Sequence, residues 1–252
     1  MIRLSNVTRQ HGGRPIIRDI SLSVERGSFV ALVGPSGAGK TTLLKAINRL
    51  VEIDGGMIAI DGEDVAALPL PALRRRIGYV FQGIGLFPHM TVAANIALVL
   101  RLQGASAAER AGRVDELLAL VSLPVALAGR YPAQLSGGQA QRVGFARALA
   151  ASPSIMLMDE PFGALDPVTR SDLGRAYRAL HERMGLTSLL VTHDMAEALL
   201  LADRIVILGE GRILADLPPA DLMAYRGDDS VRAMIDVVRD QADRLAALGK
   251  AV

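Results

Sequence analysis

The chain has 252 residues, of which 50% are hydrophobic and 21% are charged. This length suits one large domain or a core domain with a subdomain, and the apolar content excludes a disordered or collagen-like chain. The most apolar stretch, residues 189–208, contains five charged or titratable side chains. A membrane-spanning helix needs about 20 apolar residues without charge, so the sequence predicts no membrane span.

Cysteine is absent, which excludes disulfides, thiolate nucleophiles and cysteine-based metal sites. The first residues show no apolar segment of a secretory signal, so we expect a cytoplasmic location. The net charge is only +2 and aromatic residues make up 4% of the chain. Because nucleic-acid-binding faces usually combine a basic stripe with stacking aromatics, this composition favours an ordinary mixed-charge surface, and we expect no nucleic-acid partner.

Alternating apolar residues predict short strands at residues 2–4 and 20–24. Residues 29–33 form a buried apolar run before a glycine-rich loop, and residues 40 to about 50 have one apolar helical face. Residues 57–60 run into a turn, and we expect them to extend an antiparallel sheet begun by the first strands.

The rest of the chain alternates between short apolar runs and helical patterns. The runs, which predict a parallel sheet covered on both faces, lie at residues 77–81, 155–159, 188–192 and 205–208. Between residues 88 and 151 the patterns at 93–102, 107–121 and 139–151 are helical and predict an inserted helical subdomain. We therefore expect an α/β domain over residues 1–217 and a short helical tail over residues 218–252.

Residues 34–41 read GPSGAGKT and match the phosphate-binding loop at every defined position, between an apolar strand and a helix. Glycines let backbone N–H groups converge on an anion, and the helix N-terminus adds partial positive charge. Lys40 is expected to reach the β- and γ-phosphates, and the Thr41 hydroxyl is expected to bind Mg²⁺. The predicted phosphate-binding residues are Gly34, Pro35, Ser36, Gly37, Ala38, Gly39, Lys40, Thr41 and Thr42.

An acidic pair, Asp159 and Glu160, ends the apolar run that starts at residue 155. Asp159 is placed to hold Mg²⁺ through its water shell, and Glu160 is placed to orient and deprotonate an attacking water. An isolated acidic pair at a strand end is usually a surface turn. Its occurrence in a chain with a phosphate loop favours the catalytic interpretation.

Residues 135–139 read LSGGQ and precede a helical pattern, so Ser136 and the two glycines after it cap a second anion-receptive helix end. The two phosphate-seeking helix ends lie about 100 residues apart in the sequence. One nucleotide has no evident way to use both within one subunit. A head-to-tail pair of subunits, with each ATP held between the loop of one and the helix end of the other, is the economical solution.

With this segment, the sequence resembles the nucleotide-binding subunits of ABC transporters from residue 3 to about residue 215. The phosphate loop, Gln82, LSGGQ, the acidic pair, the ALD segment of residues 164–166 and His193 occur in that family's order. The resemblance implies a P-loop NTPase core with a parallel sheet, an N-terminal antiparallel β subdomain and an inserted α-helical subdomain. It also implies ATP as the nucleotide, with Mg²⁺.

The resemblance assigns further roles residue by residue. Gln82 resembles the glutamine that touches Mg²⁺ or the lytic water, and His193 resembles the histidine that contacts the γ-phosphate. Asp166 resembles the residue that crosses the dimer interface. The segment expected to contact the partner subunit's nucleotide comprises Ser136, Gly137, Gly138 and Gln139, with Ser136 and Gly138 at the γ-phosphate.

Two positions depart from the family's pattern. His11 stands where the family usually stacks adenine on an aromatic ring, and an imidazole offers less area than tyrosine. Ile16 packs either the adenine edge or the core, and both interpretations stay open. Ala140 replaces a polar residue that is common after LSGGQ.

A separate cassette without spans is the arrangement of bacterial importers. Residues 47–50, 61–64 and 76–92 are similar to those of importers of quaternary-amine osmoprotectants such as glycine betaine, choline, carnitine or proline betaine. The resemblance implies membrane permease subunits, a periplasmic or lipid-anchored solute-binding protein reached through them, and a peripheral position on the cytoplasmic side of the cell membrane. The family docks its permease at residues 82–92, where the apolar residues form either a docking groove or core: Ile84, Leu86, Phe87 and Met90.

Many osmoprotectant cassettes carry C-terminal sensing domains, whereas residues 218–252 read only as a helical tail. We therefore expect no gating by ionic strength through this tail. Alternative functions are a regulatory or scaffold ATPase, a lipid-trafficking or cell-division cassette, and import of a different solute. A small-molecule kinase would share the phosphate loop but would leave LSGGQ and His193 unexplained.

Overall fold

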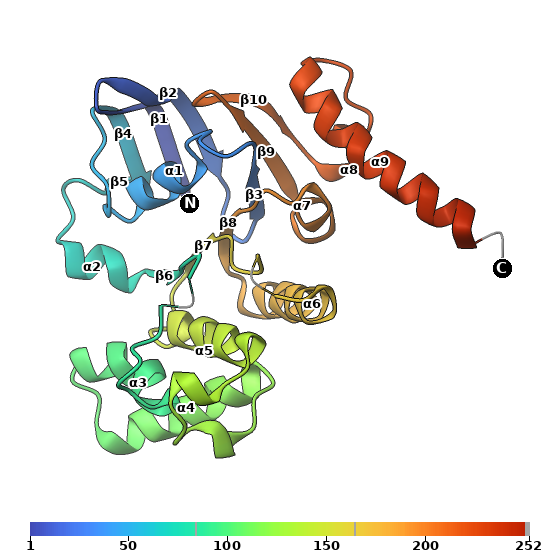
Figure 1. Ribbon diagram of the computed structural model, residues 1–252. Helices are drawn as coiled ribbons and strands as arrows, with labels where there is room; N and C mark the ends of the chain where they lie inside the picture. Colours follow the sequence, from blue (N-terminus) through green and yellow to red (C-terminus); the bar gives the residue numbers. More distant parts are fainter. Residues whose placement is uncertain (84, 164, 250–252) are drawn as a thin grey trace.

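The computed structural model describes residues 1–83, 85–163 and 165–249 and contains two sheets (Figure 1). The first has the order β2-β1-β4-β5 and is antiparallel. Its strands are β1 (Ile2–His11), β2 (Arg14–Val24), β4 (Gly55–Ile60) and β5 (Glu63–Asp64). The expectation that residues 57–60 extend an antiparallel sheet is met, because β4 pairs with β1 with Ile2 opposite Ile60.

The hairpin of β1 and β2 is longer than the sequence pattern predicts. The strands pair from Ile2 and Val24 to His11 and Arg14, with register shifts along the way. Asn6 and Asp19 have positive φ angles of 47° and 57° within the hairpin. Such bulges interrupt the alternation of apolar and polar residues, so the sequence indicated only one end of each strand.

The second sheet has the order β10-β9-β3-β8-β7-β6. Its strands are β3 (Phe29–Val33), β6 (Ile77–Val80), β7 (Ile155–Asp159), β8 (Thr187–Val191), β9 (Arg204–Gly209) and β10 (Arg212–Leu217). Five of these strands are parallel, as the sequence predicted, whereas β10 runs antiparallel to β9. The sheet is therefore mixed. Glu210 and Gly211 form the tight β9–β10 turn with positive φ angles of 48° and 78°, a geometry that joins adjacent antiparallel strands.

Alternate residues of β3 face two different hydrophobic cores. Phe29, Ala31 and Val33 belong to the core shared with the helices after β6, and Val30 and Leu32 belong to the core shared with α1 (Lys40–Ile47) and the first sheet. A central strand with both faces buried reads as a continuous apolar run, and this run led directly to the phosphate loop in the sequence. The strand that leads into the phosphate loop is therefore anchored in both hydrophobic cores.

The segment between β6 and β7 is helical and forms a lobe below the sheet in Figure 1. Its helices are α3 (Val92–Leu102), α4 (Ala107–Leu120), η1 (Val125–Leu127), η2 (Pro132–Gln134) and α5 (Gly137–Leu149). Thr91, Ser106 and Ser136 cap the three α-helices by accepting hydrogen bonds from backbone N–H groups. The exact subdomain limits at residues 88 and 151 stay a prediction.

The remaining helices flank the sheet or follow it. They are α2 (Leu70–Arg75), α6 (Pro167–Met184), α7 (Met195–Leu201), α8 (Pro219–Met223) and α9 (Asp229–Gly249). Val231 and Ile235 anchor the start of α9 in the core, and Figure 1 shows the rest of α9 extending away from the body. Within the described residues, no helix is long and apolar enough to cross a bilayer.

Candidate functional site

The phosphate loop joins β3 to α1. Gly34 has a φ angle of 153°, and a Cβ there would lie 2.1 Å from the Leu208 carbonyl oxygen, so only glycine fits. Lys40 turns back over the loop and donates from Nζ to the Gly34 and Pro35 carbonyl oxygens at 2.6 and 2.9 Å. Gly39 begins α1 without a side-chain cap, which leaves N–H groups of the first turn for an anion.

The remaining loop residues differ in exposure. Pro35, Ser36 and Gly37 are exposed, Ala38 is buried beneath them, and Thr42 is half-buried in the first turn of α1. The loop thus presents its backbone outward from a packed base, which is the arrangement that phosphate recognition by N–H groups requires.

The acidic strand end lies beside this loop. Thr41 Oγ1 donates to Asp159 Oδ1 at 2.7 Å, which joins α1 to β7. Burial raises the pKa of Asp159, and the Thr41 hydrogen bond opposes the rise. Burial also lowers the pKa of Lys40, and the neighbouring Glu160 and Asp159 charges oppose this effect. A hydroxyl and a buried carboxylate in contact are oxygen ligands suited to Mg²⁺, which usually keeps waters and binds substrate phosphates.

Glu160 turns sharply out of β7. Its φ angle is 45°, a left-handed conformation that is uncommon outside glycine and often found at functional sites. Its backbone N–H donates to the Val191 carbonyl oxygen at 2.9 Å. Its Oε2 accepts from Gln82 Nε2 at 3.0 Å and lies 3.4 Å from His193 Nδ1. The structure therefore brings together the three residues that the sequence proposed for water activation and γ-phosphate contact.

The LSGGQ segment forms a second cluster. Ser136 Oγ accepts from the Gln139 backbone N–H at 3.2 Å, and Gln139 Oε1 accepts from the Ser136 N–H at 3.0 Å. These two residues, Gly137 and Gly138 line a cavity of about 560 Å³ together with Leu165, Asp166 and Thr169. Asp166 therefore lies with the LSGGQ segment rather than with the phosphate loop. Its side chain caps the N-terminus of α6. Ala164, the first residue of the ALD segment, lies outside the described residues.

His11 lies at the exposed tip of the first hairpin, opposite Arg14. The next part of that hairpin approaches the phosphate loop, because a Cβ on Gly39 would lie 2.7 Å from the Ile16 carbonyl oxygen. Ile16 is partly buried against the core that contains α1. This half-burial agrees with the interpretation that Ile16 packs in the core. The exposed part of its side chain leaves the interpretation of packing against the adenine edge open.

The stretch after Gln82 carries exposed apolar side chains. Phe87 is 41% exposed, and Asn95 holds its backbone on both sides, donating to its carbonyl oxygen and accepting from its N–H. Leu86 packs partly against the core and Met90 is half-buried. Ile84 lies outside the described residues.

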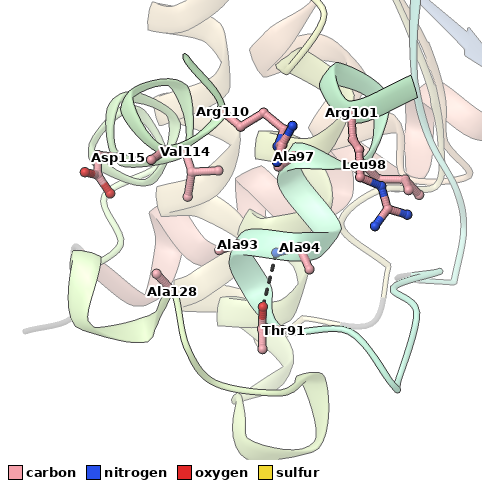
Figure 2. Close-up of a pocket in the computed structure, with 11 residues that line it drawn as sticks. Thr91, Ala93, Ala94, Ala97, Leu98, Arg101, Arg110, Val114, Asp115 and Ala128 are labelled. Carbon is pink, nitrogen blue, oxygen red and sulfur yellow. Dashed lines mark hydrogen bonds between the residues drawn. The ribbon is translucent and has the colours of Figure 1, made fainter. Parts of the chain in front are cut away.

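A cavity of about 470 Å³ opens beside this stretch, between α3 and α4 (Figure 2). Small and apolar side chains line it, among them Ala97, Leu98 and Val114, and two cations stand beside them, Arg101 on α3 and Arg110 on α4. The dashed line in Figure 2 is the cap of α3, in which the Ala94 N–H donates to Thr91 Oγ1. Asp115 also lines the cavity, so this surface combines an apolar floor with two positive charges and one negative charge.

Arg147 is a residue that the sequence analysis did not single out. It lies on α5, the helix that begins with LSGGQ, and donates from Nη1 to the Gly85 carbonyl oxygen at 2.7 Å. It thus ties the loop after Gln82 to the LSGGQ helix. A side-chain bond to a backbone carbonyl 62 residues away leaves no pattern in the sequence.

Fold and site together define a nucleotide-binding cassette of the phosphate-loop class. The ABC transporter family model matches residues 17–163, and the chain belongs to this family, as the resemblance predicted. The dimeric structure of a post-hydrolysis state of the ATP-binding cassette MJ0796, bound to ADP and Pi, is similar with a TM-score of 0.79 and 35% identity, over 90% of this chain and all of that one. The predicted α/β cassette with its antiparallel and helical subdomains is thereby confirmed.

Three curated relatives are ATP-binding proteins of uptake, transport or import systems. The glycine betaine uptake system ATP-binding protein YehX of Escherichia coli (strain K12) is 50% identical over 92% of this chain and 75% of its own length. The choline transport ATP-binding protein OpuBA of Bacillus subtilis (strain 168) is 48% identical over 93% and 62%. The sulfate/thiosulfate import ATP-binding protein CysA of Caulobacter vibrioides is 50% identical over 84% and 63%. The chain thus spans less than two thirds of the length of the last two.

Proposed function

We propose that this chain is the ATP-hydrolysing subunit of an ABC importer. The observation that carries the proposal is the convergence of Gln82, Glu160 and His193 beside the phosphate loop, with both contacts of Glu160 made by the same carboxylate oxygen. An oxygen already in contact with an amide and an imidazole is held in one orientation, as a general base must be.

In the hydrolytic step, Glu160 accepts a proton from a water whose oxygen forms a bond to the γ-phosphorus. The bond from that phosphorus to the β–γ bridging oxygen breaks, and ADP and inorganic phosphate leave. Lys40 neutralises phosphate charge that builds up in the transition state, and His193 donates a hydrogen bond to a γ-phosphate oxygen. Gln82 orients the water and the Glu160 carboxylate.

Mg²⁺ would be held by Thr41, by Gln82 and by Asp159 through water. When bound, it neutralises charge on the β- and γ-phosphate oxygens. The Thr41 to Asp159 hydrogen bond supports this assignment, since it brings two oxygen ligands together at the loop.

The functional unit proposed is a head-to-tail pair of these chains, or a pair with a second cassette. Ser136, Gly137, Gly138 and Gln139 would complete the nucleotide site of the partner, and Asp166 would cross the interface. The shared cavity of these residues, separate from the phosphate loop, supports this arrangement. ATP binding would close the pair and hydrolysis would reopen it.

Permease subunits would dock at residues 82–92 and over the adjoining cavity between α3 and α4. A helix of the permease with apolar side chains and an acidic residue would match the apolar floor and the two arginines of this surface. This docking would place the chain peripherally on the cytoplasmic side of the cell membrane. A solute-binding protein would act through the permease.

The proposed solute class is the quaternary-amine osmoprotectants of the glycine betaine and choline type, in line with two of the relatives above. Import of a different solute is the second candidate, because a sulfate/thiosulfate import protein is 50% identical over 84% of this chain. The solute is selected by the partners, so the cassette alone does not discriminate between these classes.

The test is ATP hydrolysis by the chain co-expressed with its permease, assayed with the solute-binding protein and a panel containing glycine betaine, choline, carnitine and sulfate. Stimulation by a quaternary amine supports the importer and its solute class. Stimulation by sulfate alone would replace the quaternary amines with sulfate as the solute class. Absence of hydrolysis under every condition would overturn the proposal that the chain hydrolyses ATP.

A further inference from the structure

A cluster of charged side chains lines a third cavity, of about 430 Å³, between α6 and α7. The two helices contribute to the same hydrophobic core and lie next to each other in Figure 1. Arg170 projects from α6, Asp194 caps α7, and Glu197 lies in the first turn of α7. None of these side chains takes part in the proposed hydrolytic step.

Arg170 connects two loops that carry proposed site residues. Its Nη2 donates to the Leu165 carbonyl oxygen at 3.1 Å, immediately before Asp166. Its Nη1 lies 3.4 Å from Asp194 Oδ2, immediately after His193. A planar guanidinium can hold two such acceptors at once in a fixed geometry.

Asp194 fixes the turn that carries His193. Its Oδ1 accepts from the N–H groups of Ala196 and Glu197 at 2.9 and 3.2 Å, and its own N–H donates to Thr192 Oγ1 at 3.0 Å. Burial raises the pKa of Glu197 to about 6, and the Arg170 charge is among the effects that oppose the rise. The cation therefore stabilises both carboxylates at the start of α7.

The other end of this connection reaches the LSGGQ segment. A Cβ on Gly138 would lie 2.7 Å from Thr169 Cγ2, so the segment packs directly on the residue before Arg170. Contacts therefore run without interruption from Gly138 through Thr169 and Arg170 to Asp194, and from its neighbour His193 to Glu160.

We propose that Arg170 is a positioning residue that holds the His193 turn in register with the segment carrying Asp166. The inference rests on the proposed function, in which His193 contacts the γ-phosphate bound by its own chain and Asp166 faces the partner subunit. Through Arg170, a displacement of the partner-facing segment is passed on to the histidine.

The first test compares steady-state ATP hydrolysis by the full-length wild type, Arg170→Ala and Arg175→Ala. Arg175 is the matched control, because it projects from the same helix and its ion pair with Asp172 is mostly exposed. Arg170→Ala should lower kcat about tenfold or more and change the KM for ATP less than about twofold, because small displacements at a reacting centre affect the chemical step most. Arg175→Ala should match the wild type. An unchanged kcat in Arg170→Ala overturns the proposal.

A double-mutant cycle then asks whether Arg170 acts through Asp194. Asp194→Asn keeps a capping oxygen but removes the charge, so the double variant should be no slower than the slower single variant. Losses that multiply would show independent effects and contradict the connection.

A readout without nucleotide separates this inference from the proposed function. Backbone amides of residues 192–197 should exchange hydrogen at least about threefold faster in Arg170→Ala than in the wild type. In Arg175→Ala the exchange rates of the same amides should equal those of the wild type. If the wild type hydrolyses no ATP, the proposed function fails and this comparison alone decides whether Arg170 holds the turn. Equal exchange in all three proteins would overturn it.

Discussion

Gln82 Nε2 donates to Glu160 Oε2 at 3.0 Å, although 78 residues separate the two in the sequence. Parallel strands β6 and β7 are neighbours, so the residues that follow them meet at the same edge of the sheet. The left-handed backbone of Glu160 then directs its carboxylate to this edge. The geometry of the proposed base is thus set by strand order and by one unusual φ angle.

Glu160→Gln should abolish turnover and leave ATP binding intact. The amide keeps the shape and one oxygen but cannot accept the proton, and general bases contribute about 10²- to 10⁴-fold to rate. Phosphate release should fall by at least about 100-fold, ATP should remain bound, and size-exclusion chromatography with ATP should reveal a trapped dimer. Glu182→Gln, an exposed ion-pair residue on α6, is the control. Near-wild-type turnover in Glu160→Gln would remove Glu160 as the base.

Thr41→Val should raise the Mg²⁺ concentration needed for half-maximal hydrolysis by about 10- to 100-fold, because it removes one proposed ligand and the hydrogen-bond donor to Asp159. Thr41→Ser retains the hydroxyl and should restore the wild-type requirement. Titration of activity with Mg²⁺ after chelation measures the effect. If both variants show the same Mg²⁺ dependence, Thr41 is not a metal ligand.

His11→Tyr should tighten ATP binding by about three- to tenfold, since a larger ring buries more area against adenine. The dissociation constant of the isolated chain for ATP, from fluorescent-nucleotide competition, measures this. His89→Tyr adds the same ring at an exposed position after Gln82 and should leave the constant unchanged. No tightening in His11→Tyr would contradict adenine stacking at this position.

Two glycines should respond in opposite ways to alanine. Gly112 lies exposed within α4 with open space for a Cβ, so Gly112→Ala should raise the free energy of unfolding by about 0.8–1 kcal/mol. Gly185 ends α6 with a φ angle of 59°, so Gly185→Ala should lower it by about 1 kcal/mol. Chemical denaturation of both variants measures the difference, and a shift of the same sign in both would refute the backbone argument.

Acid should destabilise the fold through His181. This residue is buried, with Nδ1 2.8 Å from Ser188 Oγ, and burial lowers its pKa below the ordinary value of 6.5. Since the unfolded chain takes up the proton first, this contribution to stability is complete above about pH 6.5 and declines as the pH falls toward the folded-state pKa. The loss of stability between pH 7.5 and 5 should be smaller in His181→Gln than in the wild type. Equal losses in the two proteins would exclude His181 as the source of this pH dependence.

The sequence predicted the strands and motifs that are formed by residues close together in the chain. The runs at residues 29–33 and 155–159 coincide with β3 and β7, because a strand buried on both faces has no polar interruption. The phosphate loop and LSGGQ are each one continuous stretch of sequence, so their residues were identified without knowledge of the fold. The antiparallel edge strand β10 was not predicted, because its half-buried residues follow no strict alternation.

Contacts between distant segments were beyond the sequence pattern. Arg147 and Arg178 both donate to backbone carbonyl oxygens, of Gly85 and Leu201, which lie 62 and 23 residues away, and a carbonyl is present at every residue. Such a partner imposes no residue type on the other segment. Only the path of the chain shows which carbonyl lies within reach of each guanidinium.

The two carbonyl bonds of Lys40 have a consequence for anion selectivity. Its ammonium donates two of its three N–H bonds to Gly34 and Pro35 inside its own loop, so a phosphate that takes more than the third must compete with these carbonyl oxygens. The net gain is the difference between two sets of hydrogen bonds, and it favours anions with several charged oxygens over chloride, which offers one diffuse charge. We therefore expect weakly bound salt anions to leave the shape of the loop unchanged, and a polyphosphate to replace the loop carbonyl oxygens as acceptors for Lys40.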